Sequence, residues 1–166
     1  MPGSRILSEE IVDLARRVVT ENAALGRTVA VAESCTGGLV CAALTEVSGS
    51  SAVLDRGFVT YSNVAKTEML GVAEDILDAF GAVSVATAWA MAQGALARSK
   101  ADVAVAITGI AGPDGGSEMK PVGTVIFARS VRGNHDIDAE EKHLDGSSRA
   151  VVRSQAALVA LELLLP

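Results

Sequence analysis

Ser34 and the glycines that follow it form the first group of residues in this chain that could do chemistry. Ser34 stands shortly before Thr36-Gly37-Gly38, and only Glu33 separates it from an apolar, β-branched run at residues 28–32. A serine hydroxyl can attack a carbonyl carbon, and free N–H groups at a helix N-terminus can hold an oxyanion or an anionic ligand. The same serine could be only a helix N-cap, with glycines that allow a tight turn. Spacing alone leaves these two interpretations about even.

A serine nucleophile needs a base, and a lysine is the best candidate in this chain. The only histidines, His135 and His143, lie in a charged segment far from Ser34, which argues against a Ser-His-Asp triad. A buried lysine with a lowered pKa can deprotonate a serine. Lys66 is the candidate, because it follows a predicted strand and stands near the only tyrosine, Tyr61. On the residues alone, a charge on a helix surface is the simpler interpretation of Lys66.

Cys35 is an alternative nucleophile, because the first turn of a helix would lower the pKa of its thiol. No histidine or asparagine partner stands near it in the sequence, and small buried cysteines are common, so we place Ser34 first. Cys35 and Cys41 are the only cysteines, and their spacing to each other and to the histidines is not that of a metal site. We therefore expect no metal and no other cofactor.

A second group of glycines follows the third predicted strand, in the segment at residues 108–116. Its glycines are Gly109, Gly112, Gly115 and Gly116. In open α/β sheets, ligands bind beyond the carboxyl ends of the strands. We therefore expect this segment and the glycine pair after Ser34 to border one cleft.

The elements that must position these residues alternate between helices and strands. Strands are predicted at residues 28–32, 56–61 and 102–107, and a hairpin at residues 122–131 and 136–143. Helices are predicted at residues 9–25, 39–44, 64–70, 74–80, 85–99 and 146–165. This alternation predicts an α/β protein, a three-layer α/β/α sandwich with a mixed, mostly parallel sheet, in a single domain that spans residues 1–166.

The composition argues against several classes of function. The chain has 166 residues, a formal net charge of −6 and only 3% aromatic residues, so it offers little to bind the phosphates or stack on the bases of DNA or RNA. No apolar run approaches the ~18 residues of a membrane helix, and acidic residues come early at the N-terminus, where a secretory signal would be apolar. Two unpaired cysteines fit a reducing compartment. We therefore expect a cytoplasmic protein without a membrane or nucleic-acid partner.

Three segments resemble, in the same order, the signatures of the CinA C-terminal domain family. They are residues 33–38 (Glu-Ser-Cys-Thr-Gly-Gly), residues 57–66 and residues 108–116. Residues 120–125 and the final Ser148-Arg149 with Arg153 resemble the family too, so that the resemblance covers residues 8–165. It implies a three-layer α/β/α fold that usually forms a homo-oligomer. It also implies hydrolysis of nicotinamide mononucleotide to nicotinic acid mononucleotide and ammonia, a step of pyridine nucleotide salvage.

The resemblance also implies roles for individual residues. Ser34 matches the serine nucleophile, Lys66 the lysine base, and Tyr61 a tyrosine of the same catalytic site. Thr108 and Arg149 match positions near the substrate. The remaining substrate contacts are expected from backbone N–H groups, near the oxyanion or near the phosphate, at Thr36, Gly37, Gly38, Gly109 and Gly112.

The expected ligand is therefore a small-molecule nucleotide, hydrolysed without a metal. Two alternatives stay open. One is a non-catalytic module that uses the same cleft to sense a phosphorylated metabolite or to bind a protein partner. The other is an amidase for a different amide.

Overall fold

A five-stranded mixed sheet forms the centre of the molecule. Its strands are β1 (Val29–Glu33), β2 (Leu54–Val59), β3 (Val103–Gly109), β4 (Thr124–Val131) and β5 (Asp138–His143). They lie in the order β2-β1-β3-β4-β5. β1 pairs in parallel with β2 and β3, whereas β4 pairs antiparallel with β3 and β5. Four strands therefore run in one direction, and β4 runs against them.

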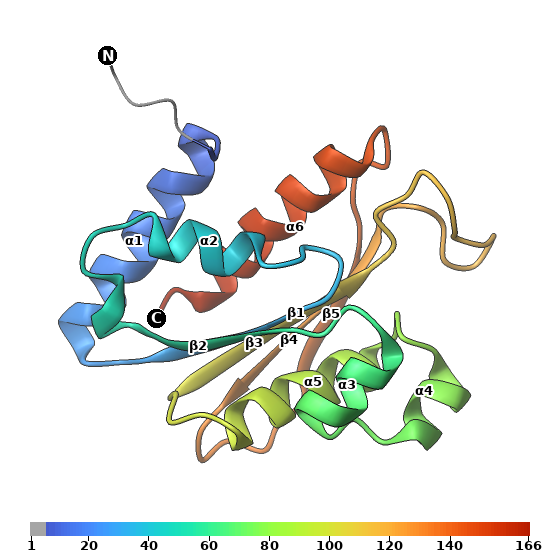
Figure 1. Ribbon diagram of the computed structural model, residues 1–166, viewed down its shortest axis with the longest axis horizontal. Helices are drawn as coiled ribbons and strands as arrows, with labels where there is room; N and C mark the ends of the chain where they lie inside the picture. Colours follow the sequence, from blue (N-terminus) through green and yellow to red (C-terminus); the bar gives the residue numbers. More distant parts are fainter. Residues whose placement is uncertain (1–5) are drawn as a thin grey trace.

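The structure is a computed structural model that describes residues 6–166. Within this range, helices cover both faces of the sheet (Figure 1). One face carries α1 (Glu9–Leu25), α2 (Leu39–Thr45) and α6 (Arg149–Leu164), and the other carries α3 (Asn63–Leu70), α4 (Glu74–Phe80) and α5 (Val85–Ala97). The predicted three-layer α/β/α architecture with a mixed sheet is confirmed. Residues 1–5, part of the segment in which we expect no secretory signal, lie outside the described range.

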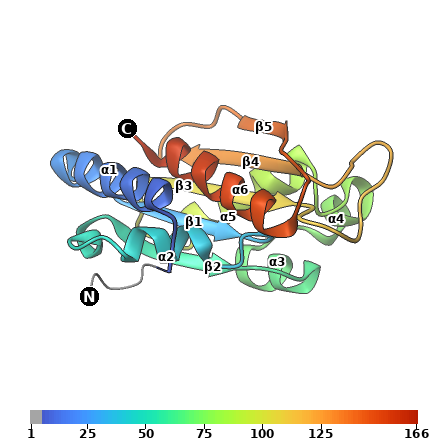
Figure 2. The ribbon, with the colours of Figure 1, turned by 90° about the horizontal axis from the view of Figure 1, so that it is seen from above.

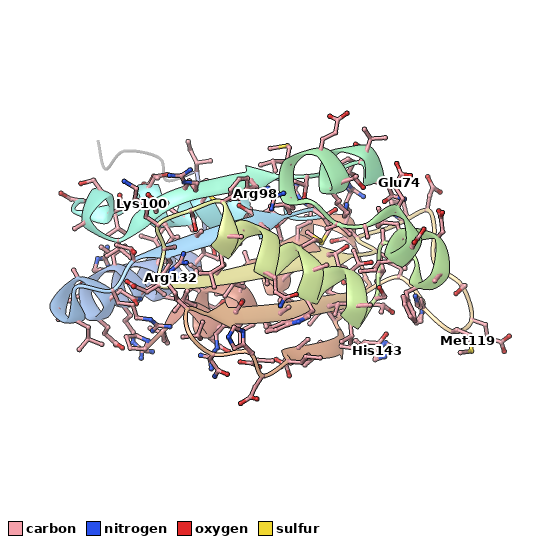
Figure 3. The ribbon with its side chains drawn as sticks, turned by 90° about the horizontal axis from the view of Figure 1, so that it is seen from below. Glu74, Arg98, Lys100, Met119, Arg132 and His143 are labelled. Atoms are coloured by element: carbon pink, nitrogen blue, oxygen red, sulfur yellow. The ribbon has the colours of Figure 1, made fainter. Side chains whose placement is uncertain are left out.

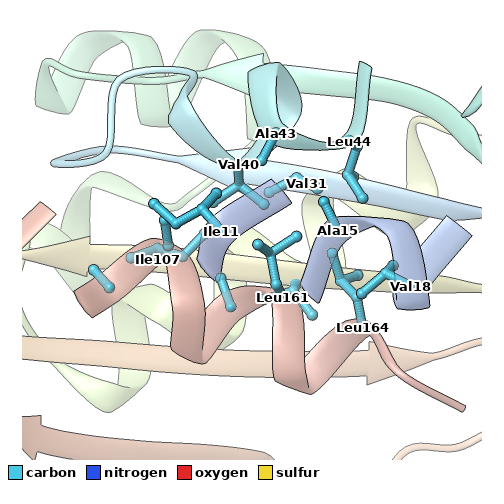
Figure 4. Packing of buried hydrophobic residues seen from close by; sticks show 14 of the residues in the cluster. Ile11, Ala15, Val18, Val31, Val40, Ala43, Leu44, Ile107, Leu161 and Leu164 are labelled. Atoms are coloured by element: carbon cyan, nitrogen blue, oxygen red, sulfur yellow. The ribbon is translucent and has the colours of Figure 1, made fainter. Parts of the chain in front are cut away.

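The alternation of large and small residues in the central strands sets the two cores apart. Val29 and Val31 of β1 pack with α1, α2 and α6, whereas Ala30 and Ala32 pack on the side of α5. β3 repeats this pattern, because successive side chains of a strand point to opposite faces. Figure 4 shows the first core, in which valine, leucine and isoleucine side chains of α1, α2 and α6 meet over β1 and β3. Alanines on the other face let α5 approach the sheet closely.

The structure moves several predicted boundaries, and three of these changes lie near the candidate site. β2 ends at Val59, so that Tyr61 lies in the connection to α3, and β3 continues to Gly109. α6 begins at Arg149 rather than at residue 146, because the hydroxyl of Ser148 caps it by accepting a hydrogen bond from the Val151 N–H. In the part of the chain that the structure describes, no helix is long and apolar enough to span a membrane.

The carboxyl ends of β1, β2 and β3 meet at one edge of the sheet, near the start of α6 (Figure 2). The connection between β3 and β4, residues 110–123, projects beyond this edge (Figures 1 and 2). Met119, which is 87% exposed, lies near the tip of this projection (Figure 3). The elements therefore bring the two predicted glycine groups to the same end of the molecule.

Candidate active site

Ser34 lies in the turn between β1 and α2, at the carboxyl end of a central strand. Its N–H donates a hydrogen bond of 2.9 Å to the carbonyl of Ile107 in β3, and its own carbonyl accepts one of 3.0 Å from the Gly37 N–H. Gly37 and Gly38 have φ angles of 59° and 101°, in the left-handed region that favours glycine. The turn is thus anchored to the neighbouring strand and folded back on itself, with Ser34 at its beginning.

The structure shows that Ser34 is not a helix N-cap. The N-cap of α2 is Gly38, which has no side chain to accept a hydrogen bond. The Ser34 Oγ instead lies 2.9 Å from the Nζ of Lys66. The interpretation of Ser34 as only a cap is therefore wrong, and its hydroxyl is paired with an amine that comes from another element of the fold.

Lys66 is 1% exposed, although it belongs to a short helix at the surface of the sheet. The hydroxyl of Ser62 caps this helix, α3, and so places Lys66 in its first turns with the side chain directed inward. Its Nζ donates hydrogen bonds to the carbonyls of Thr60 (2.8 Å) and Tyr61 (3.1 Å). The interpretation of Lys66 as a charge on a helix surface is therefore wrong.

Burial lowers the pKa of Lys66, because the charged ammonium loses its hydration inside the protein. The neighbouring Cys35 raises the pKa of Lys66, but its effect is smaller than that of burial. Among residues 6–166, no carboxylate forms an ion pair with Lys66. A buried lysine that bonds only carbonyls and a hydroxyl can give up its proton more easily than an exposed lysine.

The environment of Cys35 disfavours the thiolate form that a cysteine nucleophile needs. Burial raises the pKa of its thiol to about 11, so that the thiol keeps its proton at neutral pH. Cys35 precedes α2 instead of lying in its first turn, and the predicted lowering of its pKa is therefore wrong. The Nζ of Lys66 forms its hydrogen bond with Ser34. Ser34 is thus the better nucleophile of the two neighbours.

A cleft of about 280 Å³ opens over the Ser34–Lys66 pair. It is lined by Ser34, Cys35, Tyr61, Lys66, Ala82, Val83, Thr108, Gly109, Ile110, Ala111, Gly112, Asp114, Gly115, Gly116 and Arg149. We call the buried polar residues Ser34, Lys66 and Thr108 its floor. The exposed residues Tyr61, Arg149, Asp114, Gly115 and Gly116 form its rim. The two glycine groups flank this space, although only the second one lines it.

Arg149 and Tyr61 face each other across the rim. The Nη2 of Arg149 donates a hydrogen bond of 2.9 Å to the Tyr61 hydroxyl, and its Nη1 donates one of 2.8 Å to the carbonyl of Gly112. Arg149 therefore ties the connection after β2 to the connection after β3. Within the described residues no carboxylate pairs with this guanidinium. An incoming anion would meet a cation whose charge is not already neutralised by an acid.

Thr108 and Gly109 shape the wall of the cleft. The hydroxyl of Thr108, which is 1% exposed, donates a hydrogen bond of 2.9 Å to the carbonyl of Ala82. This bond holds the connection between α4 and α5 against the site. A side chain at Gly109 would overlap Val125, because its Cβ would lie 2.7 Å from the Val125 Cγ2. The backbone of β4 can approach the site only if this position is glycine.

Thr36, Gly37 and Gly38 do not line the cleft. The Thr36 side chain is fully buried and donates a hydrogen bond of 2.6 Å to Glu33. The N–H of Gly37 is already bonded to the Ser34 carbonyl. Among residues 6–166, no main-chain carbonyl accepts the N–H of Cys35, the residue directly after Ser34. Residues 36–38 therefore stabilise the turn that carries Ser34 and do not contact the space of the cleft.

The chain is similar to known proteins over nearly its whole length. The sequence model of the CinA C-terminal domain matches residues 11–166. The chain belongs to the CinA C-terminal domain family. The nicotinamide-nucleotide amidohydrolase PncC of Escherichia coli K12 is 50% identical over 155 residues, which cover 93% of each chain. A CinA-like protein of Shewanella woodyi is 44% identical over 98% of this chain but only 38% of its own length.

A solved structure of the family shares the fold. The crystal structure of a competence/damage inducible protein from Agrobacterium tumefaciens superposes with a TM-score of 0.93 at 51% identity, and the match covers 96% of each chain. The resemblance predicted from the three sequence segments is thus confirmed, together with the α/β fold.

Two apolar residues of the cleft, Ala82 and Val83, lie outside the segments that the sequence predicted for the site. With Ile110 and Ala111 of the predicted segment at residues 108–116, they make up the apolar part of the lining. Ala82 and Val83 lie between the Gly81 that closes α4 and the Ser84 that caps α5, and nothing in their residue types marks them as part of a site. They give the cleft an apolar wall beside its polar floor.

A larger hollow of about 480 Å³ lies elsewhere, along α1. Its charged side chains pair with one another, Asp13 with Arg16 and Arg17 with Glu21. It contains no buried polar pair like Ser34 and Lys66, so the chemistry of this CinA-family chain is better sought in the smaller cleft.

Proposed function

We propose that the chain is an amidohydrolase that converts nicotinamide mononucleotide to nicotinic acid mononucleotide and ammonia. The observation that carries this proposal is the 2.9 Å contact between the Ser34 Oγ and the buried Lys66 Nζ, at the floor of a cleft. The substrate is suggested by the 50% identity to PncC, a nicotinamide-nucleotide amidohydrolase. Release of the free acid would return the pyridine nucleotide to salvage.

Lys66 acts as the general base in this proposal. A neutral amine has two N–H bonds and one lone pair. The carbonyls of Thr60 and Tyr61 accept two hydrogen bonds from Nζ, so the lone pair is left to face the Ser34 hydroxyl. The lowered pKa increases the fraction of Lys66 in this neutral form at neutral pH. The two carbonyls thus orient the base as well as hold it.

Ser34 then attacks the carboxamide carbon, and its proton passes to Lys66. The negative charge that develops on the amide oxygen needs N–H donors, each typically worth about 3 kcal/mol in such a site. The N–H of Cys35 is the best placed candidate, because it follows the nucleophile directly and no main-chain carbonyl of residues 6–166 accepts it. The N–H of Gly37 is engaged within the turn, so we do not assign it this role.

The C–N bond breaks when the protonated Lys66 gives its proton to the amide nitrogen, which leaves as ammonia. Ser34 is then esterified by the acyl group of the substrate. A water molecule, deprotonated by the again neutral Lys66, attacks this ester and releases the carboxylic acid. The proton returns from Lys66 to Ser34, so that the protein is unchanged after one turnover. Ser34, Lys66 and the attacking water account for every proton transfer in this sequence, and the backbone N–H groups only stabilise the oxyanion.

Arg149 is our candidate for the phosphate of the substrate. It lies on the rim with a guanidinium that no carboxylate of the described residues neutralises. A guanidinium can bind a phosphate through two parallel hydrogen bonds. The backbone of Gly112, Gly115 and Gly116 borders the same space and offers further N–H donors. A cleft with a polar floor, an apolar wall and an arginine on its rim suits a phosphorylated aromatic amide.

Ammonia release from nicotinamide mononucleotide tests the proposal. The wild-type chain should release ammonia and the free acid in equal amounts, and Ser34→Ala should reduce the rate at least about 10³-fold while it retains the fold. Near-normal turnover by Ser34→Ala would exclude Ser34 as the nucleophile. Binding of the nucleotide by the wild-type chain without any ammonia would favour a sensing module over an enzyme.

A further inference from the structure

Glu33 is a fully buried carboxylate that directly precedes the proposed nucleophile and takes no part in the chemistry above. Its Oε1 accepts hydrogen bonds from the Thr36 hydroxyl (2.6 Å) and the Val40 N–H (3.0 Å), and its Oε2 accepts one from the Cys41 N–H (3.1 Å). Within the described residues no Lys or Arg forms an ion pair with it. A buried charge of this kind is costly unless its hydrogen bonds are complete.

These hydrogen bonds give α2 the cap that its own N-cap residue lacks. Gly38 has no side chain, so it cannot satisfy the free N–H groups of the first helical turn. Val40 and Cys41 carry two of these groups, and Glu33 accepts both from the end of β1. A negative charge is also favoured at a helix N-terminus. Glu33 therefore ties the end of β1 to the start of α2, and the turn that carries Ser34 spans the gap between them.

Arg153 holds the same turn from α6. Its Nε donates a hydrogen bond of 3.1 Å to the Cys35 carbonyl, and its Nη2 donates one of 3.0 Å to the Thr36 carbonyl. Thr36 is therefore fixed twice, by its hydroxyl to Glu33 and by its carbonyl to Arg153. Arg153 follows Arg149 by one helical turn, so one helix reaches both the rim of the cleft and the turn beneath it.

We propose that Glu33 and Arg153 are positioning residues, which hold the turn at residues 34–38 so that the Ser34 Oγ stays within hydrogen-bond reach of Lys66. Neither side chain lines the cleft, so both act through the turn and not through the substrate. The kinetic part of this inference rests on the proposed amidohydrolase activity. The structural part does not, because it concerns only the conformation of the turn.

Kinetics test the first part. In Glu33→Gln, an amide group replaces one acceptor oxygen and faces an N–H donor, and in Arg153→Met both bonds to the turn are lost. We expect each variant to lower kcat by about 10- to 100-fold, since small misplacements of reacting groups have effects of this size. KM should stay within about twofold, because the rim is unchanged. Both variants loosen one turn, so the double variant should lose less than the product of the two single losses.

Cys35 supplies a readout that does not depend on turnover. It lies in the same turn, is 5% exposed and has a raised pKa, so it should react slowly with a thiol reagent. We expect Glu33→Gln and Arg153→Met to increase the rate of labelling at Cys35 at least about 10-fold, measured by mass spectrometry of the Cys35 peptide. If the wild-type chain proved inactive on the nucleotide, this labelling would still decide whether the two residues hold the turn.

Asn22→Ala is the matched control for lost stability. The buried Asn22 side chain donates hydrogen bonds of 2.8 Å and 2.9 Å to the carbonyls of Val18 and Leu164, and it does not line the cleft. This variant should melt at a lower temperature, but its kcat and Cys35 labelling, measured where it is fully folded, should stay within about twofold of wild type. Equal effects of Glu33→Gln, Arg153→Met and Asn22→Ala would overturn the proposal.

Thr36 keeps the inference testable if the charge variants fail to fold. Thr36→Val replaces the hydroxyl that donates a hydrogen bond to Glu33 with a methyl group of similar size, whereas Thr36→Ser retains the hydroxyl. We expect Thr36→Val to lower kcat and to speed Cys35 labelling, and Thr36→Ser to restore both toward wild type. Wild-type kcat and labelling in Thr36→Val would contradict the proposal.

Discussion

The floor and the rim of the cleft differ in how far their side chains are exposed to water. Lys66 and Ser34 on the floor are 1% and 7% exposed, and Lys66 is fixed by three hydrogen bonds to the protein. Tyr61 on the rim is 62% exposed, and its hydroxyl is held by the exposed Arg149. One region is therefore desolvated and rigidly bonded, and the other is open to solvent.

This difference indicates a division of tasks between bond cleavage and recognition. A lysine can serve as a base only if its charged form is disfavoured, which requires burial. Removing a charged phosphate from water is costly, which suits donors that remain partly exposed to solvent. The net charge of −6 does not conflict with an anionic substrate, because the rim presents Arg149 without a carboxylate partner among residues 6–166. We expect floor variants to change kcat and rim variants to change KM.

Of the variants that compare floor and rim, Lys66→Met should lower kcat/KM the most. It removes the proposed base, and general-base catalysis typically contributes about 10²- to 10⁴-fold to a rate, so kcat/KM should fall by about 10³-fold. In the wild-type chain kcat/KM should rise with pH, because a lysine whose pKa is lowered becomes a base as its proton leaves. This rise should be absent from the pH–rate profile of Lys66→Met.

Lys142→Met is the control for this variant, since Lys142 lies on β5 away from the cleft and pairs with Glu140. Its kcat and KM should equal those of wild type. If Lys66→Met raised KM and left kcat intact, Lys66 would belong to recognition and the distinction between floor and rim would be wrong.

The pairing of Ser34 with Lys66 shows what the sequence could and could not predict. The glycine groups and the alternation of elements predicted the three layers and one cleft between two loops. From the residues alone, Ser34 could be either a nucleophile or a helix N-cap, and an exposed position on a helix was the simpler interpretation of Lys66. A contact between residues so far apart in the sequence depends on how β1, β2 and α3 pack, which local patterns do not record. Resemblance to the family, not physical reasoning, singled out this pair.

Glu33 and Thr36 show a second limit. Ser34 was considered as the N-cap of the helix predicted at residues 39–44, because serine is a good N-cap. The structure begins α2 at Leu39, as predicted, but the buried Glu33 and not Ser34 accepts free N–H groups of its first turn. The turn therefore points Thr36 inward to Glu33, and the substrate contact predicted at Thr36 is not supported by the lining of the cleft. Local propensity could not reveal a cap that comes from the preceding strand.

Arg149→Met should have the next largest effect, on recognition. Loss of a charge-assisted contact to phosphate should raise KM for nicotinamide mononucleotide by about 10- to 100-fold, with kcat changed only a few-fold. KM for nicotinamide riboside, which lacks the phosphate, should hardly change. The KM of Arg149→Lys for nicotinamide mononucleotide should lie between the values of wild type and Arg149→Met, because a lysine retains the charge but lacks the planar pair of donors.

Steady-state kinetics with both substrates would check this prediction. An equal rise in KM for the phosphorylated and the phosphate-free substrate would show that Arg149 does not bind the phosphate. A loss confined to kcat would place Arg149 with the floor.

Tyr61→Phe should have the smallest effect. It removes the hydroxyl that Arg149 contacts and leaves the Tyr61 carbonyl, which orients Lys66, in place. We therefore expect KM to rise about two- to fivefold, the size of one solvent-exposed hydrogen bond, with kcat almost unchanged. A fall in kcat of about 100-fold or more would instead mean that the Tyr61 hydroxyl delivers the proton to the departing ammonia. Tyr61 would then belong to the chemistry although it is exposed.

The proton affinity of Lys66 tests the central claim most directly. The chain contains only four lysines, so isotopic labelling of their side chains should give few NMR signals, and Lys66→Met would identify one of them. We predict that Lys66 titrates below the ordinary lysine pKa of about 10.4, and that kcat/KM rises over the same pH range. A Lys66 pKa at or above that ordinary value would mean that the lysine is charged in the working enzyme, and it would contradict the assignment of Lys66 as the base for Ser34.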